Sequence, residues 1–266
     1  MCLLVLAWQA HPRYRLVVAA NRDEFHERPT APLAKWPAPG EILAGRDLRA
    51  NGTWLGLDHR RYFGVITNFR ELQRPRPEAP SRGALIPRYL ADGSAAAFLT
   101  GLEPEASRYS GFNLLLTDDD SLWYASNRTQ PFARELRPGV YGLSNQSLDT
   151  PWPKLRRVRR RFDTWLAHGS SGLRDPANAF AAGLFDLLDD RATATAAEEL
   201  PQTGISPEWE RVLSAPFVLH PDYGTRCSTV VLLEPSGAGY LAERRFDSSG
   251  MLTGATEFVL APGEWP

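Results

Sequence analysis

Two continuously apolar runs open the chain. Cys2–Trp8 and residues 15–20 show no alternation of polar and apolar positions, which is typical of strands buried on both faces. A short polar turn containing Pro12 separates them, so the pattern predicts a hairpin that begins at the second residue. Further strands are predicted at 53–57, 62–67, Phe112–Thr117, Leu122–Ser126, 140–144, 227–233, 240–246 and 256–260.

The predicted helices occur in groups that alternate with groups of predicted strands. They are found at 82–90, Ala95–Leu102, from Pro153 onward and at about Ala177–Leu188, while 193–219 is expected to be irregular. Blocks of helices, rather than one helix after each strand, disfavour a Rossmann fold or a barrel. We therefore expect one α+β domain over residues 1–266, with mostly antiparallel sheets and segregated helices.

Composition and charge narrow the class of protein. The 266 residues are 43% hydrophobic and 23% charged, with a formal net charge of −1, which is ordinary globular composition. No global basic field attracts nucleic acid or anionic membrane, and no apolar stretch approaches the roughly 20 residues that span a bilayer. The first eight residues lack the basic start and cleavage site of a signal peptide. We expect a cytoplasmic protein without integral membrane association.

The two cysteines, Cys2 and Cys227, suit a reducing compartment, although one disulfide bridge stays open at this point. Removal of Met1 would give Cys2 a free α-amine with a pKa of about 7.7–8.0 beside a thiol with a pKa of about 8.5. One residue would then hold a nucleophile and a base. On this feature alone, a small core residue in a buried strand is the more common role of such a cysteine.

The tetrapeptide Asn21-Arg22-Asp23-Glu24 directly follows the second apolar run. Four consecutive polar side chains cannot all pack in a core, so some are expected to face a cleft or solvent. Asp23 is a candidate to hold the Cys2 α-amine, and Asn21, Arg22 and Glu24 are candidates for substrate binding. The alternative is a capping turn, because Asn and Asp commonly end strands.

Three further candidates lie at strand ends. Asn68 and Asn145 each follow a predicted strand, where a side-chain amide can donate to an oxyanion, although Asn there is usually a turn residue. A glycine turn at Tyr223-Gly224 is expected to open a strand, with Arg226 near its start. Arg226 can pair with a carboxylate of substrate or of Asp23, or form a structural ion pair.

Other chemistry finds little support in the sequence. It contains no glycine-rich phosphate or dinucleotide loop and no Cys or His pair at metal spacing, so we expect neither cofactor nor metal. The arginine cluster at positions 156–161 is an anion-binding candidate, but the solvated face of an amphipathic helix explains it better.

Several motifs in a fixed order resemble the NRDE family, whose animal members are called transport and Golgi organisation proteins. They cover the chain from end to end: Met1-Cys2, Asn21-Arg22-Asp23-Glu24-Phe25, Arg28-Pro29, Gly52-Thr53-Trp54-Leu55-Gly56, Thr67-Asn68, Gly111-Phe112-Asn113-Leu114, Tyr141-Gly142-Leu143-Ser144-Asn145, Thr150-Pro151-Trp152-Pro153-Lys154 and Tyr223-Gly224-Thr225-Arg226.

That family in turn resembles the N-terminal nucleophile hydrolases of the cysteine type, such as bile-salt hydrolases and penicillin V acylases. The resemblance implies a four-layer αββα sandwich of two mostly antiparallel sheets. It also implies that Cys2, Asp23, Asn68, Asn145 and Arg226 occupy catalytic positions of that group and that Asn21 matches the Asn of its Arg-Asn-x-Asp element. One position departs from the pattern: Ala20 stands where the group has Arg, and the arginine is Arg22.

Two functions from different classes follow. The first is a cysteine amidohydrolase in which Cys2 attacks the carbonyl of a linear amide and its α-amine carries the proton. Asp23 orients that amine, Asn68 and Asn145 stabilise the oxyanion, and Arg226 supports the thiolate. The second is a non-catalytic binding or trafficking protein for haem or another hydrophobic small molecule. A structural remnant without a ligand is a third possibility.

Overall fold

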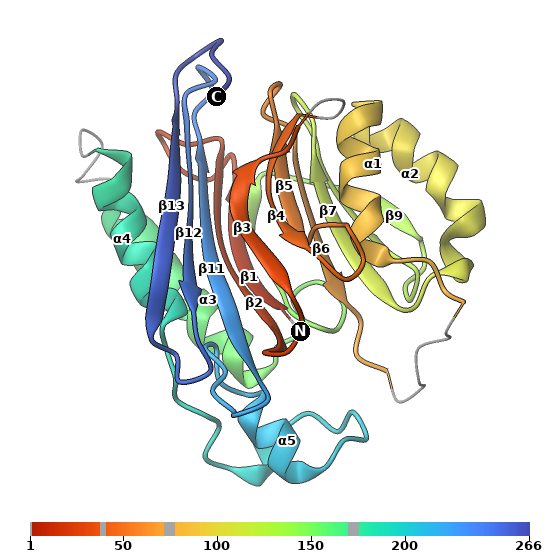
Figure 1. The fold of residues 1–266 in the computed structure, drawn as a ribbon, viewed down its shortest axis with the longest axis vertical. Coiled ribbons are helices and arrows are strands. Elements are labelled where there is room, and N and C mark those ends of the chain that lie inside the picture. The colour runs from red at the N-terminus through yellow and green to blue at the C-terminus, as the bar shows by residue number, and fades with distance from the viewer. Residues whose placement is uncertain (1, 38–40, 72–77, 170–175) are drawn as a thin grey trace. The chain divides into compact units, whose positions relative to one another are not determined.

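The computed structural model describes residues 2–37, 41–71, 78–169 and 176–266. They form two compact units: Met1–Glu27, Pro138–Ser144 and Leu148–Pro266 make up unit 1, and Arg28–Arg137 with Asn145–Ser147 make up unit 2. Each unit has its own antiparallel sheet, with helices against one face (Figure 1).

Unit 1 contains a six-stranded sheet in the order β10-β1-β2-β11-β12-β13. Its strands are β1 (Cys2–Trp8), β2 (Leu16–Phe25), β10 (Gly139–Leu143), β11 (Tyr223–Leu233), β12 (Gly239–Phe246) and β13 (Leu252–Leu260). Its helices are α3 (Pro153–Gly169), α4 (Ala177–Leu188) and α5 (Pro207–Val212), with a 3-10 turn η4 at Ala197–Glu199. Both α3 and α4 pack on the sheet.

The core of unit 1 lies between this sheet and the apolar face of α3 and α4. Leu155, Val158 and Phe162 of α3 are buried there, as the helical periodicity predicts, against strand residues such as Val5 and Val17. Burying one such side chain contributes about 1.5–3 kcal/mol, so this face fixes α3 on the sheet and positions the residues at its start.

Unit 2 contains a seven-stranded meander in which strands β3 to β9 follow in chain order. They are β3 (Thr30–Lys35), β4 (Ile42–Asp47), β5 (Leu55–Asp58), β6 (Phe63–Asn68), β7 (Phe112–Thr117), β8 (Leu122–Ser126) and β9 (Ala133–Leu136). The helices α1 (Leu85–Asp92) and α2 (Ala95–Leu102) pack on this sheet, and the 3-10 turns η1 (Arg82–Ala84) and η2 (Glu103–Arg108) precede and follow them.

Most predicted elements are confirmed, and each omission has a local cause. Strands β3, β4 and β9 and helix α5 were not expected from the sequence. Strands β3 and β9 are the edges of their sheet and have mostly exposed or half-buried residues, so they lack an apolar signal. Strand β4 contains Gly45, Arg46 and Asp47, and α5 is a single short amphipathic segment.

Two boundaries at the candidate site required correction, and β13 begins four residues earlier than the predicted strand at 256–260. The Asn21–Glu24 tetrapeptide does not follow a strand but lies inside β2, which continues to Phe25. Tyr223-Gly224 likewise lies inside β11 and forms no turn. Both segments are polar or glycine-containing, and each is held in extended form by pairing with the other, Tyr223 with Phe25 and Gly224 with Glu24. A capping turn at the tetrapeptide is therefore excluded.

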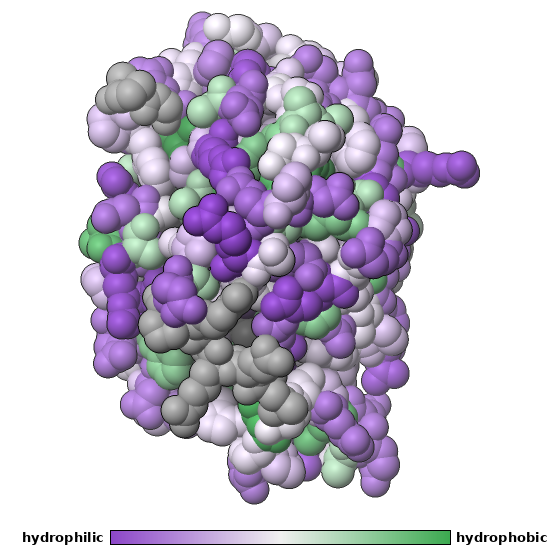
Figure 2. All heavy atoms as spheres, turned by 90° about the vertical axis from the view of Figure 1, so that its right-hand side faces the viewer, coloured by the Kyte–Doolittle hydropathy of each residue, from purple (hydrophilic) through white to green (hydrophobic). Residues whose placement is uncertain are grey.

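The fold class α+β is confirmed, with two antiparallel sheets and helices segregated from the strands. The face-to-face arrangement of the sheets in a four-layer sandwich, and a single domain over 1–266, stay predictions. Among the described helices, none is both long and apolar enough to cross a membrane. The surface in Figure 2 is mainly hydrophilic, with small scattered apolar areas.

Backbone packing in unit 2 leads to the first prediction. A Cβ atom on Gly52 would come within 2.5 Å of the Gly83 carbonyl oxygen and 2.9 Å of the Ala84 nitrogen, and backbone atoms cannot rotate away. We expect Gly52→Ala to lower the free energy of unfolding by about 1–3 kcal/mol, measured by urea denaturation. Gly101→Ala is the matched control, because a Cβ there meets nothing within 4 Å. An unchanged midpoint for Gly52→Ala would contradict this packing.

Candidate functional site

Cys2 is the first residue of β1 and belongs to a row of paired residues across three strands. Cys2 pairs with Arg22 of β2, and Arg22 pairs on its other side with Cys227 of β11. Directly paired residues of antiparallel strands project to the same face. Arg22 therefore lies between the two sulfur-bearing residues, on the opposite face from Asn21 and Asp23.

Cys2 is a half-buried residue, and its thiol has ionisable neighbours. Burial raises the pKa of the Cys2 thiol above its ordinary value, and the carboxylates of Asp23 and Glu24 raise it further, while the Arg22 guanidinium opposes them. Burial raises the pKa of the Cys227 thiol to well above the ordinary value, and this residue is 3% exposed. The two cysteines thus differ in access and in charged surroundings.

Sheet geometry also settles whether these cysteines form a bridge. Both are free thiols, and they pair with Arg22 from opposite sides of β2. Two strand spacings separate their Cα atoms by about 10 Å, whereas a disulfide needs less than about 7 Å. The bridge that the sequence left open is therefore excluded in this fold.

Asp23 is the buried acid of the site. The Thr225 hydroxyl donates to its Oδ1 at 2.7 Å, and the Lys154 Nζ lies 3.9 Å from its Oδ2. Tyr223 donates its hydroxyl to the Asp23 carbonyl oxygen at 3.0 Å. Burial raises the pKa of the Asp23 carboxyl, and the Lys154 ammonium is the strongest of the side-chain groups that pull this pKa back down.

Asn21 serves as an anchor between elements of unit 1. Its Nδ2 donates to the carbonyl oxygens of Leu188 and Pro216, both at 2.9 Å, and its Oδ1 accepts from the Ser228 hydroxyl at 2.6 Å. Both amide hydrogens are thus used inside the protein. Substrate binding by Asn21 stays a prediction, and it would require one of these bonds to break.

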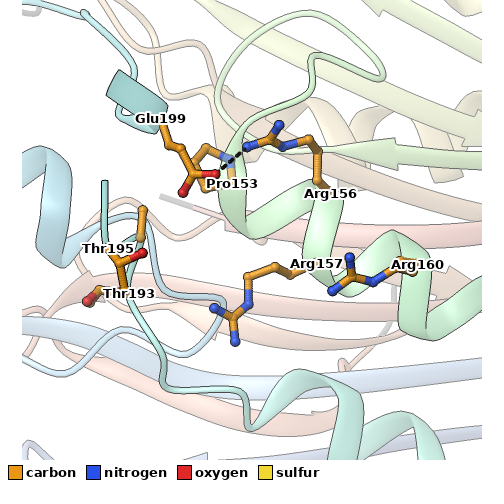
Figure 3. Close-up of a pocket in the computed structure, with 8 residues that line it drawn as sticks. Pro153, Arg156, Arg157, Arg160, Thr193, Thr195 and Glu199 are labelled. Carbon is orange, nitrogen blue, oxygen red and sulfur yellow. Dashed lines mark hydrogen bonds and ion pairs between the residues drawn. The ribbon is translucent and has the colours of Figure 1, made fainter. Parts of the chain in front are cut away.

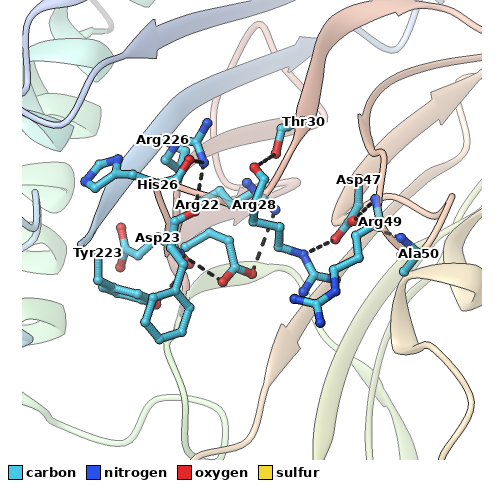
Figure 4. Close-up of polar contacts among 12 residues, drawn as sticks. Arg22, Asp23, His26, Arg28, Thr30, Asp47, Arg49, Ala50, Tyr223 and Arg226 are labelled. Atoms are coloured by element: carbon cyan, nitrogen blue, oxygen red, sulfur yellow. Dashed lines mark hydrogen bonds and ion pairs between the residues drawn. The ribbon is translucent and has the colours of Figure 1, made fainter.

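Arg22, Glu24 and Arg226 surround these groups at the ends of β2 and β11. Arg22 Nη2 lies 3.8 Å from Glu24 Oε2. Arg226 is the extra residue at a bulge in β11, and its Nη1 donates to the carbonyl oxygens of Phe25 and His26 at 2.9 and 3.2 Å (Figure 4). The residue paired with Cys2 is therefore Arg22, while support of the thiolate by Arg226 stays a prediction.

The two predicted oxyanion donors lie together in unit 2. Asn145 is fully buried, and its Nδ2 donates to the Asn68 carbonyl oxygen at 2.9 Å. Among the residues that the structure describes, the side-chain amide of Asn68 has no hydrogen-bond partner. Ser144, which precedes Asn145 in the chain, belongs to unit 1 and donates its hydroxyl to the Cys2 carbonyl oxygen at 3.1 Å.

Three partners of Asp23 were not assigned a role from the sequence: Lys154, Thr225 and Tyr223. Thr225 and Tyr223 carried a weak signal, because they flank Gly224 in a family motif. The signal for Lys154 was stronger, since only two of the 30 basic residues of the chain are lysines. A lysine in an arginine-rich chain, at the start of a helix with an apolar face, indicates that this position specifically needs lysine.

A separate pocket of about 350 Å³ lies over the start of α3 in unit 1. Arg156, Arg157 and Arg160 line it together with threonines 193 and 195 and Glu199 (Figure 3). Arg157 donates to Asp190 through Nη2 at 3.0 and 3.1 Å and through Nε at 3.3 Å, and Arg156 pairs with Glu199 at 3.4 Å. These acids balance much of the positive charge, as on the solvated helix face that the sequence favoured.

Comparison with known proteins identifies the family of this α+β chain. The sequence model of the family Transport and Golgi organisation 2 matches residues 1–248. The Transport and Golgi organization 2 homolog of Mus musculus is 33% identical over 279 residues, covering 98% of this chain and 99% of the mouse protein. The Homo sapiens homolog is 33% identical over 283 residues, with 98% and 99% coverage.

The chain therefore belongs to the Transport and Golgi organisation 2 family, which confirms the resemblance to the NRDE proteins. Among solved structures, the Caenorhabditis elegans N-acylethanolamine-hydrolyzing acid amidase ortholog aligns with 88% of this chain and 93% of its own. Its TM-score is 0.48 and its sequence identity is 12%.

The unequal surroundings of the two thiols give the second prediction. Iodoacetamide is expected to modify Cys2 in preference to Cys227 in the folded protein, because Cys2 is the more exposed of the two residues. Since burial raises the pKa of both thiols, the rate of labelling increases as the pH rises. Peptide mass spectrometry identifies the modified residue. The Cys227→Ser variant should keep one reactive thiol, and preferential labelling of Cys227 would contradict the described burial.

The anchor function of Asn21 gives the third prediction. Asn21→Ala leaves two buried carbonyl oxygens and the Ser228 hydroxyl without their partner, so we expect the free energy of unfolding to fall by about 3 kcal/mol. Ser228→Ala, which keeps both Nδ2 bonds, is expected to cost about 1 kcal/mol. Urea unfolding measures both values. Equal costs for the two variants would show that the bonds to Leu188 and Pro216 contribute little.

Proposed function

We propose that this protein is an N-terminal cysteine hydrolase that cleaves a linear amide C–N bond of a small substrate. The observation that carries the proposal is the setting of Cys2. Cys227 is buried beside Arg22, whereas Cys2 is a half-buried residue at the start of β1 and lies near the charges of Arg22, Asp23 and Glu24.

In the proposed first step, the Cys2 Sγ forms a bond to the amide carbonyl carbon, and the thiol proton passes to the α-amine that loss of Met1 exposes. The carbonyl oxygen becomes an oxyanion, for which Asn68 and Asn145 are the proposed donors. The C–N bond then breaks, and the leaving amine takes the proton from the α-ammonium. Water hydrolyses the resulting thioester and regenerates Cys2.

The side chains of unit 1 have separate roles in this proposal. Asp23 lies on the opposite sheet face from the Cys2 thiol, so we assign it to the α-amine at the strand end and not to the sulfur. Arg22 pairs with Cys2 across the strands, which makes it the nearest candidate to stabilise the thiolate, with Arg226 beside it. Arg22 and Glu24 are also the proposed substrate-binding residues.

The fourth prediction tests turnover. The intact mass should lack one methionine residue, because the reaction needs the free amine of Cys2. On a panel of fluorogenic acyl amides, Cys2→Ala and Asp23→Asn are each expected to lower kcat by about 10⁴-fold or more. Cys227→Ser is the matched control, which should keep the wild-type rate because this thiol is buried.

The same variants test the alternative, a carrier of haem or another hydrophobic molecule. Cys2→Ala deletes only one sulfur atom from the site, so a carrier would keep most of its affinity. If haem binds equally to wild type, Cys2→Ala and Asp23→Asn, and wild type cleaves no amide in the panel, the carrier function replaces the hydrolase. Retention of Met1 in the purified protein would likewise contradict the proposed mechanism.

A further inference from the structure

Lys154 is a lysine with its ammonium group inside the protein. It is the second residue of α3, its side chain is 1% exposed, and the Asp23 side chain that it faces is 0% exposed. Lysine is almost never buried to this degree unless it is paired. The pair consists of Lys154 Nζ and Asp23 Oδ2 at 3.9 Å.

Stability of the helix does not explain this lysine. A positive charge in the first turn opposes the helix dipole, which favours acidic side chains at that end. Stability of the core does not explain it either, because an apolar pair of similar volume commonly holds a fold as well as a buried ion pair does. The position of Lys154 is instead explained by the residue that it contacts.

The ionisable groups around Asp23 come from four elements. They are Lys154 of α3, Cys2 of β1, Arg22 and Glu24 of β2, and Tyr223 of β11. Burial favours the neutral form of the Asp23 carboxyl, and among these side chains Lys154 opposes that effect most strongly, ahead of Arg22. The Thr225 hydroxyl assists through its hydrogen bond to Oδ1.

We propose that Lys154 is a positioning residue that keeps Asp23 ionised and thereby sets the charge state of the Cys2 α-amine, an inference that rests on the proposed function. An ionised Asp23 accepts a hydrogen bond from the amine and holds it. Because Lys154 already balances the charge of Asp23, the amine is not forced to stay protonated. It therefore keeps the lone pair that must accept the thiol proton.

Lys154 neither gives nor takes a proton in this scheme. When the Cys2 Sγ bonds to the carbonyl carbon, the thiol proton moves to the α-amine nitrogen and the π electrons move to the carbonyl oxygen. The ion pair of Asp23 and Lys154 is the same before and after the step. Lys154 acts through Asp23 alone, which separates its function from that of a catalytic residue.

The fifth prediction is that Lys154→Met shifts two titrations in the same direction. Without the Lys154 ammonium, the pKa of Asp23 rises. The pKa of the Cys2 α-amine rises as well, because the charge of the neighbouring carboxylate is no longer balanced. The acid limb of kcat/KM is expected to move up by at least about 1 pH unit, with the rate recovering in alkaline solution. Lys154→Arg keeps the charge and should keep most of the wild-type profile. Lys35→Met, a change at the exposed lysine that pairs with Glu41, is the matched control.

A carboxyl ¹³C NMR titration gives a readout that needs no substrate. The Asp23 signal is assigned by its loss in the double variant Asp23→Asn/Lys154→Met, which contains neither buried charge. We expect an ionised Asp23 at neutral pH in wild type and an upward shift of its midpoint by at least about 1 pH unit in Lys154→Met. If wild type cleaves no amide, the proposed function fails, and this titration still decides whether Lys154 controls Asp23.

Three results would overturn the inference. One is a protonated Asp23 at neutral pH in wild type, a measurement that requires no folded single variant of Lys154. Another is a folded Lys154→Met protein whose Asp23 midpoint and acid limb both match wild type. Loss of rate at every pH without a shift of the acid limb would show that Lys154 serves only the structure, and would also overturn it.

Discussion

Pairing of β2 along both edges is the constraint on which the rest of unit 1 depends. All of its residues, Leu16 to Phe25, form ladder partners with β11, and the segment up to Arg22 also pairs with β1. This pairing takes a polar tetrapeptide into the interior, where each side chain needs a partner. Asn21 donates to the carbonyl oxygen of Leu188 at the end of α4. Asp23 accepts a hydrogen bond from Thr225 of β11 and pairs with Lys154 of α3. The positions of both helices are therefore linked to the polar half of one strand.

Burial of these polar and charged side chains costs free energy. Removing a charged group from water costs several kcal/mol even after the protein relaxes, and an ion pair whose atoms are 3.9 Å apart recovers only part of it. The Asn21 network is different, because its hydrogen bonds satisfy both ends of the amide and its main effect is to hold the loop at Pro216 and the end of α4 against the sheet.

The strand geometry also separates the chemistry of Cys2 from that of Cys227. Both sulfur atoms lie on the same sheet face as Arg22, but one strand lies between them, so they cannot form a bridge and do not share a role. Cys227 is buried, while Cys2 is half-buried at the start of β1. In the proposed mechanism, which requires loss of Met1, the Cys2 thiol would face Arg22 on one side of the sheet and its α-amine would face Asp23 on the other.

The sequence alone was sufficient for the family, the α+β class and most of the elements. Apolar runs predict strands such as Phe112–Thr117, and the apolar stripe at Leu155, Val158 and Phe162 predicts α3, because burial imposes a period that the sequence preserves. Only the tertiary structure decided that Asn21–Glu24 is strand, that Arg22 pairs with Cys2, and that Lys154 contacts Asp23. Those facts depend on cross-strand register and on the docking of α3, which brings Lys154 to a residue over a hundred positions away, and no local pattern of polarity contains that information.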